Sequence, residues 1–431
     1  MWGNLARLRR IITPDCTIAE RRALLPLGNP RRTLTPPPLG VLIRPVTPAN
    51  VKARADRDLR LRLRAGAQYL TCSKAVAKCG RALAGRDAAG DYGTVSLRVS
   101  WPIGHEPRAY FAGLYRCSSV WECPVCAPRV QRGRAAEAQE LNARHDASGG
   151  GMYLVTLTVP HDVGDRLKPM RKHVSRTWSR ILNGDPWKRW RDRLGFVGYV
   201  RALEATHGPN GWHPHVHVAL YTVAPVPARE LVRFRTWLRN RWRDKVTRRT
   251  PEGIVYRAPD RRHGVKISAL RQSSYLTKMG LASWELTSSS TKAGRHGHRT
   301  PFQVLRDLVC GDDPERRRRD AGVWAEWAAG IKGARQLVYS PGLRRRYRLG
   351  EELPDDRLPD CQADLELTGA GDGDLTLWTF SREEWANVVR SRHSVSIRCR
   401  LLAVVELQRD LWDDEVVRIL DRAAGLPAVP F

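Results

Sequence analysis

The clearest pattern of apolar and polar positions begins near residue 150. In Tyr153–Val159 apolar side chains alternate with threonine, which predicts a strand that ends at Pro160. Two more strands are predicted over Phe196–Ala205 and Trp212–Tyr221, on either side of the turn-forming run 207–211. The full expected order is a strand, a helix (165–182), a strand–turn–strand unit, a helix (227–246), a short strand (265–267) and a helix (273–282).

This order predicts an α+β fold in which helices flank a mainly antiparallel sheet, resembling a split βαβ unit of the ferredoxin or RRM kind. Composition divides the rest of the chain. The expected segments are a disordered basic arm rich in proline and arginine (1–65), a cysteine-rich module (66–145), a catalytic domain (146–290), a basic loop and helical DNA-contacting segment (291–350) and an acidic helical C-terminal module (351–431).

The charge balance indicates a polyanionic partner. The 431 residues include 74 Lys and Arg against 44 Asp and Glu, a net charge of +30. An excess of this size favours DNA as the partner. Residues 351–431 carry 17 acidic and nine basic residues, so DNA is expected to bind the remainder. Apolar runs are short and no signal-peptide core is evident, so we expect a cytoplasmic protein without a membrane partner.

The most informative segment is the third strand, which contains three alternating histidines. His213, His215 and His217 are expected to point to one face of the strand, and neutral imidazoles bind divalent ions well. If the hairpin turns near Pro209, Glu204 lies opposite about residue 214, beside these histidines. A set of imidazoles and one carboxylate with open positions is typical of a catalytic ion.

Tyr275 and Lys278 are the next candidates. On the helix expected there they are three residues apart and share a face. A nearby ammonium or metal ion favours the phenolate, and Lys278 has the alternative role of holding a phosphate. Together with the histidines this predicts metal-assisted attack of Tyr275 on a phosphodiester, which leaves a 5′-phosphotyrosine and a free 3′-hydroxyl.

Cysteines and basic aromatic runs add two further expectations. Cys123 and Cys126, with Cys117 six residues earlier, predict part of a structural Zn²⁺ site whose fourth ligand is Cys79, with Cys72 as the reserve. Tryptophans and basic residues alternate in 187–193 and 237–243. We expect the tryptophans in the core and assign phosphate contacts to Lys188, Arg189, Arg191, Arg239, Arg241 and Arg243.

Taken together, these motifs resemble those of a known family. The family is the rolling-circle replication initiators of the HUH endonuclease class, of the actinobacterial plasmid type with a single catalytic tyrosine. The matching segments are 153–161, Glu204 with 211–217, 275–278 and the cysteine segment 117–127.

The resemblance implies a fold with the histidine pair on the middle strand of the sheet and the tyrosine on a facing helix. It also implies Mg²⁺ or Mn²⁺ at His215, His217 and Glu204, with His213 as a ligand or a neighbour. The implied substrate is one strand of a plasmid origin, single-stranded or in a hairpin, and a host helicase and polymerase are candidate partners. Some relatives carry a glutamate shortly before the tyrosine, where this chain has Arg271, so the termination step is open.

Two alternatives follow from the same residues. A single-tyrosine HUH transposase or a conjugative relaxase would use the same site on a different DNA. A zinc-containing DNA-binding regulator without catalysis would use the histidine strand structurally. Replacing Tyr275 by phenylalanine separates the second alternative from the enzyme.

Overall fold

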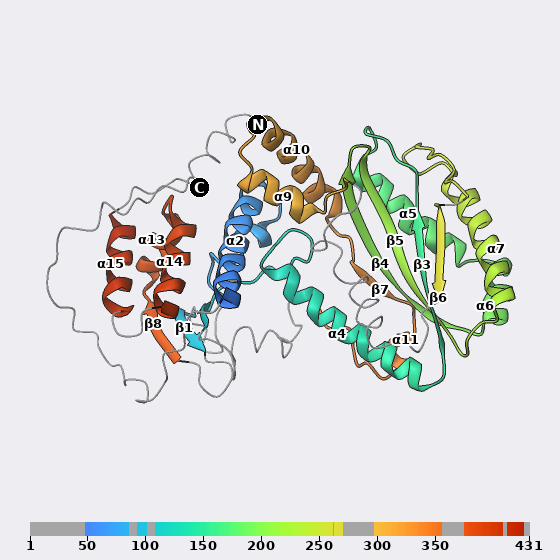
Figure 1. The fold of residues 1–431 in the computed structure, drawn as a ribbon, viewed down its shortest axis with the longest axis horizontal. Helices are drawn as coiled ribbons and strands as arrows, with labels where there is room; N and C mark the ends of the chain where they lie inside the picture. The colour runs from blue at the N-terminus through green and yellow to red at the C-terminus, as the bar shows by residue number, and fades with distance from the viewer. Residues whose placement is uncertain are drawn as a thin grey trace. The chain divides into compact units, whose positions relative to one another are not determined.

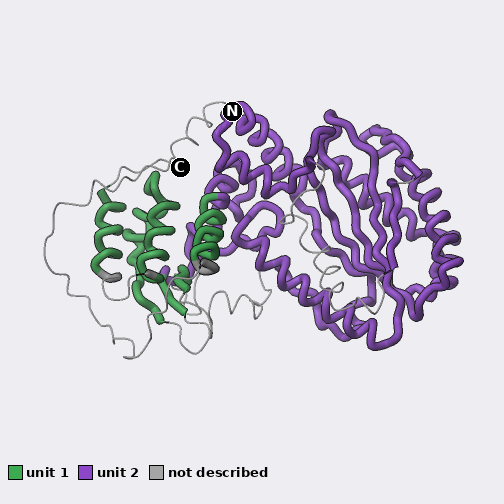
Figure 2. Tube along the Cα trace, viewed as in Figure 1, with its two compact units in different colours: residues 1–62, 96–112, 368–431 green, residues 63–95, 113–367 purple. Residues whose placement is uncertain are grey.

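The computed structural model describes most of the chain beyond the first 47 residues. The described residues are 48–85, 93–100, 108–261, 263–269, 297–355, 375–407 and 412–425. They fall into two compact units (Figure 2): unit 1 comprises residues 1–62, 96–112 and 368–431, and unit 2 comprises 63–95 and 113–367. Each unit is described by itself below.

Unit 2 is built on a five-stranded sheet in which every neighbouring pair is antiparallel (Figure 1). The strand order is β6-β3-β5-β4-β7, so β5 is the middle strand. The strands are β3 (Gly151–Thr158), β4 (Phe196–Gly208), β5 (Gly211–Thr222), β6 (Val265–Ala269) and β7 (Leu337–Tyr339). The predicted α+β class and the predicted strands are confirmed, and β7 is added to them.

The β4–β5 hairpin turns through two residues, Pro209 and Asn210, because Gly208 pairs with Gly211. Gly211 has φ +86, and a Cβ there would lie 3.1 Å from the Asp162 carbonyl oxygen, so this position requires glycine. The turn fixes the register and pairs Glu204 directly with His215. The sequence estimate of residue 214 is wrong by one position, and that error would have placed Glu204 on the opposite face of the sheet.

One face of the sheet is apolar and covered by helices. Val155, Leu157 and Val218 are fully buried there. The ring of Trp178, on α5, packs edge-on against Tyr199 of β4 at 5.6 Å. The helices on this side are α5 (Leu167–Ile181), α6 (Asp185–Leu194) and α7 (Ala228–Val246), with α7 beside α5 and α6. The bounds of α5 and α7 agree closely with the expected helices at 165–182 and 227–246.

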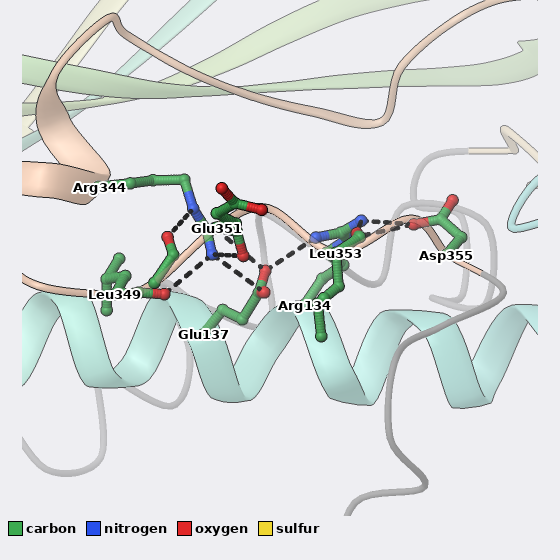
Figure 3. Close-up of polar contacts among 8 residues, drawn as sticks. Arg134, Glu137, Arg344, Leu349, Glu351, Leu353 and Asp355 are labelled. Atoms are coloured by element: carbon green, nitrogen blue, oxygen red, sulfur yellow. Dashed lines mark hydrogen bonds and ion pairs between the residues drawn. The ribbon is translucent and has the colours of Figure 1, made fainter.

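Among the described residues, α4 covers one end of the other face. Leu141 of α4 (Cys126–Ala147) joins Met152, Ala219 and Tyr347 in a buried cluster on this face. Figure 3 shows the chain after α11 (Leu343–Arg346) running along α4, where Arg134 binds Asp355 and Arg344 binds Glu137. His215 and His217 lie toward the other end of this face, beyond α4, where Glu204 and His217 are buried and His215 is half-buried.

Three helices complete unit 2. They are α3 (Lys74–Lys78), α9 (Pro301–Cys310) and α10 (Pro314–Ile331). Arg299 forms a two-pronged ion pair with Asp320 of α10, whose side chain is almost fully buried, and it also binds Asp307 of α9. This pair fixes the chain that precedes α9 against α10, next to the end of β4, where Arg299 bridges His207.

Unit 1 combines a three-stranded sheet with helices. The sheet has the order β2-β1-β8, and Glu406 is buried where Arg54, Arg57 and the Ala109 amide bind its carboxylate. The elements are most of α2 (Pro48–Leu70), β1 (Val95–Ser100), β2 (Arg108–Ala112), β8 (Leu375–Phe380), α13 (Arg382–Arg390), α14 (Ser394–Leu407) and α15 (Trp412–Ala424). This ion cluster ties α2 to α14.

Two sequence expectations about the ends of the chain are corrected. Residues 48–65 of the expected disordered arm are helical, because α2 buries Leu61 and Leu63 on one side. The acid excess of the C-terminal module lies in residues 351–374, which carry nine acidic residues and one basic residue, whereas acids and bases balance over 375–431, which contain β8 and the three helices. None of the described helices is long and apolar enough to cross a membrane.

Candidate functional site

Three ligand-type side chains converge on the sheet face that α4 covers at its other end. The Nε2 atoms of His215 and His217 both lie 3.2 Å from Oε2 of Glu204. We call these residues the Glu-His-His group. Strand pairing produces the convergence, because Glu204 of β4 lies directly opposite His215 of β5, and His217 lies two residues further along the same face.

The second nitrogen of each imidazole is held by a hydrogen bond. His217 Nδ1 lies 3.1 Å from Oγ1 of Thr156 on β3, and His215 Nδ1 lies 3.3 Å from the His213 carbonyl oxygen. A proton on Nδ1 would turn the Nε2 lone pair of each imidazole toward Glu204, the arrangement in which a cation can bind between them. The contacts at Nδ1, one from β3 and one from β5 itself, are compatible with this tautomer.

Glu204 is a carboxylate at neutral pH. Burial acts to raise the pKa of its carboxyl, but the imidazoles of His215 and His217 outweigh burial and hold this pKa well below its ordinary range. Two ligands about 2.1 Å from one octahedral ion lie ~3 Å apart when they are neighbours. The 3.2 Å separations in the Glu-His-His group match that spacing.

His213 lies beside the Glu-His-His group and outside it. Only Glu204, His215 and His217 bring their ligand atoms within 4.8 Å of one another in this part of the described sheet. His213 Nδ1 lies 3.2 Å from Nδ1 of His161, and its ring lies 5.7 Å from that of His298. Burial, together with the charges of the surrounding histidines, lowers the pKa of His213 to about 3. The His213 imidazole is therefore neutral, and in this structure it lies next to the group without joining it.

Four cysteines form a second, closed group. The sulfurs of Cys79, Cys117, Cys123 and Cys126 all lie within 4.8 Å of one another. We call them the four-cysteine group. Sulfurs bound tetrahedrally to one ion at about 2.3 Å lie ~3.8 Å apart. The Cys79 sulfur lies 3.7 Å from that of Cys123 and 3.6 Å from that of Cys126, which fits this arrangement.

The elements around the four-cysteine group decide which cysteines take part. The short helix α3 carries the chain from exposed Cys72 to buried Cys79, so Cys79 joins the group and Cys72 does not. Gln68 of α2 donates to the carbonyl oxygens of Val76, Ala77 and Cys79 and orders this turn. Hydrogen bonds from the other three thiols lower the pKa of the Cys79 thiol.

Comparisons with known proteins bear on the same residues. Residues 114–243 match the model of a family described as replication protein. This segment contains the whole Glu-His-His group and three cysteines of the four-cysteine group. This segment of the chain is therefore assigned to that family by similarity.

Named relatives agree with this assignment. A Streptomyces lividans protein called Protein rep is 29% identical over 61% of this chain and 69% of its own length. A Bacillus amyloliquefaciens Protein rep is 30% identical over 32% of this chain and 42% of its own length. A Streptomyces cyanogenus protein named neomycin resistance protein is 32% identical over 24% of this chain and 30% of its own length. No solved structure matches.

The basic residues that the sequence assigned to DNA lie away from the Glu-His-His group. Lys188, Arg189 and Arg191 are exposed on α6, and Arg239, Arg241 and Arg243 are half-buried on α7. These helices cover the opposite face of the sheet. Between them Trp187 and Trp242 are buried and the Trp190 and Trp237 rings lie 5.9 Å apart, so the tryptophans form core as expected.

Tyr275 and Lys278 lie outside the described residues, as does the helix expected at 273–282. Sequence reasoning also missed residues that the structure places at the site. Thr156 was assigned only to the polar face of its strand, and His161 and His298 had no role. The signal for Thr156 was its alternation in 153–159, but the pairing of Thr156 with His217 is visible only in the sheet.

Proposed function

We propose that the protein initiates rolling-circle replication of a plasmid by nicking one strand of the origin DNA. The proposal rests on one observation above all, the convergence of Glu204, His215 and His217 in a segment assigned by similarity to the replication protein family. Three protein ligands leave coordination positions for substrate, as catalytic sites require. Tyr275 is the proposed nucleophile, because the segment 275–278 resembles the tyrosine motif of HUH endonucleases.

The Glu-His-His group fits a divalent cation, Mg²⁺ or Mn²⁺. It offers one carboxylate oxygen and two imidazole nitrogens, a donor set that suits Mn²⁺ and is compatible with Mg²⁺. When bound, such an ion polarises a phosphodiester and offsets the charge that develops on it. Thr156 and the His213 carbonyl oxygen orient the imidazoles for this task.

In the proposed reaction the Tyr275 oxygen attacks the scissile phosphorus in line. A bond forms between the tyrosine oxygen and phosphorus, and the bond from phosphorus to the 3′ oxygen breaks. The phenol proton leaves, and the 3′ oxygen takes up a proton to become a free hydroxyl that can prime synthesis. Lys278 favours the phenolate or holds the phosphate. Reversal of these steps rejoins strands without ATP, since the phosphoester is conserved.

The four-cysteine group has a structural role in this proposal. Four sulfurs with tetrahedral spacing suit Zn²⁺ and leave no open position. The ion would hold the segments on either side of Cys79 and Cys117 against the start of α4. DNA is the partner of the nicking reaction, and a host helicase and polymerase would extend the strand.

The test is formation of a covalent adduct. Purified protein with single-stranded origin DNA and Mn²⁺ should give a protein–DNA species that survives a denaturing gel. Tyr275→Phe should abolish it while DNA binding persists, and EDTA should suppress it in the parent. An adduct that still forms with Tyr275→Phe would show that the nucleophile is another residue.

The same assay separates the rival functions. A DNA-binding regulator would give no adduct with any DNA, and Tyr275→Phe would behave as the parent does. A transposase or relaxase would give the adduct on transposon ends or a transfer origin and none on a plasmid replication origin. The termination step can be measured separately, as the rejoining of DNA strands. This step is of interest because some relatives carry a glutamate where this chain has Arg271.

A further inference from the structure

A hollow of about 410 Å³ lies at the end of α4 that is far from the four-cysteine group. It is lined by Arg144 of α4, Arg346 of α11, Tyr347 and Arg348. Leu141 and Tyr347 belong to the buried cluster that covers one end of the sheet face carrying the Glu-His-His group. The hollow therefore lies on the same side of the sheet as the Glu-His-His group, whereas α6 and α7 lie on the other side.

The walls of the hollow are firmly held. The Arg144 guanidinium donates to the carbonyl oxygens of Tyr347 and Arg348. The Tyr347 hydroxyl lies 2.6 Å from Nδ1 of His145, whose Nε2 lies 3.0 Å from the Gly151 carbonyl oxygen at the start of β3. With Nε2 donating to Gly151, Nδ1 accepts from the tyrosine. This chain of hydrogen bonds anchors the hollow to the sheet.

The charge in the hollow is not balanced by protein. Arg144 pairs with Glu140. Arg346 and Arg348 are exposed, and neither forms an ion pair with any residue in the described part of the chain. Three guanidinium groups thus share one carboxylate. Guanidinium groups bind phosphate oxygens in pairs of parallel hydrogen bonds, so the hollow is suited to a phosphate group.

The backbone at Arg348 forms the left-handed cap that ends α11. Arg348 has φ +51, and the amides of Arg348 and Leu349 donate to the carbonyl oxygens of Arg345 and Arg344. Glycine is the usual residue at such a cap, whereas here an arginine occupies it and lies at the rim of the hollow.

The occupant is identified by what the hollow offers. Its one aromatic ring, Tyr347, is buried and its hydroxyl is used by His145, so the hollow has no exposed ring on which a base can stack. The charged groups instead face solvent, where a passing strand can reach them. These features favour backbone phosphate over a base or a nucleotide.

We propose that this arginine hollow holds a backbone phosphate of the DNA strand bound at the Glu-His-His group. β3 connects the two places, because Gly151 anchors the hollow and Thr156 holds His217 five residues later, about 17 Å at ~3.4 Å per residue. The strand would follow this side of the sheet from one to the other. The inference rests on the proposed function only in taking DNA as the partner, and it does not depend on cleavage.

The test compares salt dependence of binding. Oligo(dT) long enough to reach both places is titrated at several salt concentrations with the parent and with the double variant Arg346→Gln/Arg348→Gln. Loss of the contact to one phosphate should reduce the slope of log K against log salt by about 0.7, the value per phosphate for single strands. The matched control, Arg418→Gln/Arg422→Gln on α15 of unit 1, removes the same charge and should leave the slope near the parent value.

Two further measurements keep the outcomes distinct. Arg348→Gly removes one guanidinium and places glycine at the left-handed cap, so it should weaken strand binding severalfold while its melting temperature stays the same or rises. An unchanged slope in the double variant overturns the hollow and leaves the nicking proposal intact. A reduced slope in the double variant, together with a parent protein that forms no covalent adduct, would support the hollow and overturn the nicking proposal. The last outcome is that inorganic phosphate binds the parent but not the double variant, while both bind the DNA strand equally well. This would assign the hollow to a small anion and overturn its proposed role in holding the DNA strand.

Discussion

The two ligand groups of unit 2 differ in number, enclosure and origin. The Glu-His-His group has three ligands on a sheet face, beyond the end that α4 covers, and its members lie within 14 residues of one hairpin, from Glu204 to His217. The four-cysteine group has four ligands and spans Cys79 to Cys126, with β1 and β2 between the first two cysteines. The first group is positioned by the pairing of long strands. The second joins a turn to a loop and the start of a helix, which a backbone hydrogen bond from the Gly80 amide to the Tyr115 carbonyl oxygen also holds together.

In the proposed function this difference corresponds to two uses of a metal ion, one catalytic and one structural. A preformed group of three ligands binds an ion weakly enough to exchange ligands with substrate. A closed sulfur group converts the binding free energy of the ion into folding free energy. Damage to the four-cysteine group should therefore appear in stability, and damage to the Glu-His-His group should appear in chemistry.

The largest effect is expected from Cys123→Ser. Cys123 is fully buried in the four-cysteine group, and loss of one thiolate should release the ion and cost several kcal/mol of the free energy of unfolding, out of roughly 10–16 kcal/mol for binding a structural zinc. Metal content and the melting temperature measure the change. Cys72→Ser is the control, because Cys72 is exposed and outside the group, and should leave both unchanged. Equal losses in the two variants would contradict the ligand assignment.

The next effect is expected from His217→Ala. Loss of one ligand should lower the rate of adduct formation by on the order of 10³-fold, about 4 kcal/mol of transition-state stabilisation. The melting temperature should change little, because β5 remains paired on both sides. His213→Ala is the matched control from the same strand face and should keep most of the rate. A His213 variant as inactive as the His217 variant would place His213 among the ligands.

A smaller effect is expected from Thr156→Val, which removes the acceptor for His217 Nδ1 at nearly constant volume. Loss of such a partner typically weakens metal binding by about 10–100-fold. The Mn²⁺ concentration that gives half of the maximal adduct measures it. Thr158→Val is the control, because the Thr158 hydroxyl binds the His263 carbonyl oxygen and no imidazole. If both valine variants need the same Mn²⁺ concentration as the parent, the tautomer of His217 is fixed in another way.

The smallest effect is expected from Gln68→Ala beside the four-cysteine group. The Gln68 amide donates to three carbonyl oxygens around Cys79, and its loss should cost about 1–2 kcal/mol of the free energy of unfolding. Denaturant unfolding measures this cost, and release of the ion to a chelator should become faster. Adduct formation in excess Mn²⁺ should stay at the parent rate. A slower adduct would mean that the two groups are coupled.

Much of unit 2 was predictable from local patterns. Alternation in Tyr153–Val159 and Trp212–Tyr221 gave the strands, and helical spacing in 227–246 gave α7. Alternation also placed His215 and His217 on one face, because side chains on a strand change face at every residue. Residues 48–65 were predicted poorly, since proline and arginine there suggested an arm where a helix packs Leu61 and Leu63. The apolar side of that helix is recognisable only once the segments that pack against it are known.

The sequence by itself determined which residue types carry the chemistry and on which side of their strand the imidazoles point. Only the tertiary structure decided that Glu204 lies opposite His215, that Thr156 holds His217, and that Cys79 takes the place for which Cys72 was the reserve. It also placed the arginines of α6 and α7 on the face opposite the Glu-His-His group and those of the arginine hollow on the same side. The physical reason is that alternation is a property of a few neighbouring residues, whereas register and contact depend on turns and on strands far away in the chain.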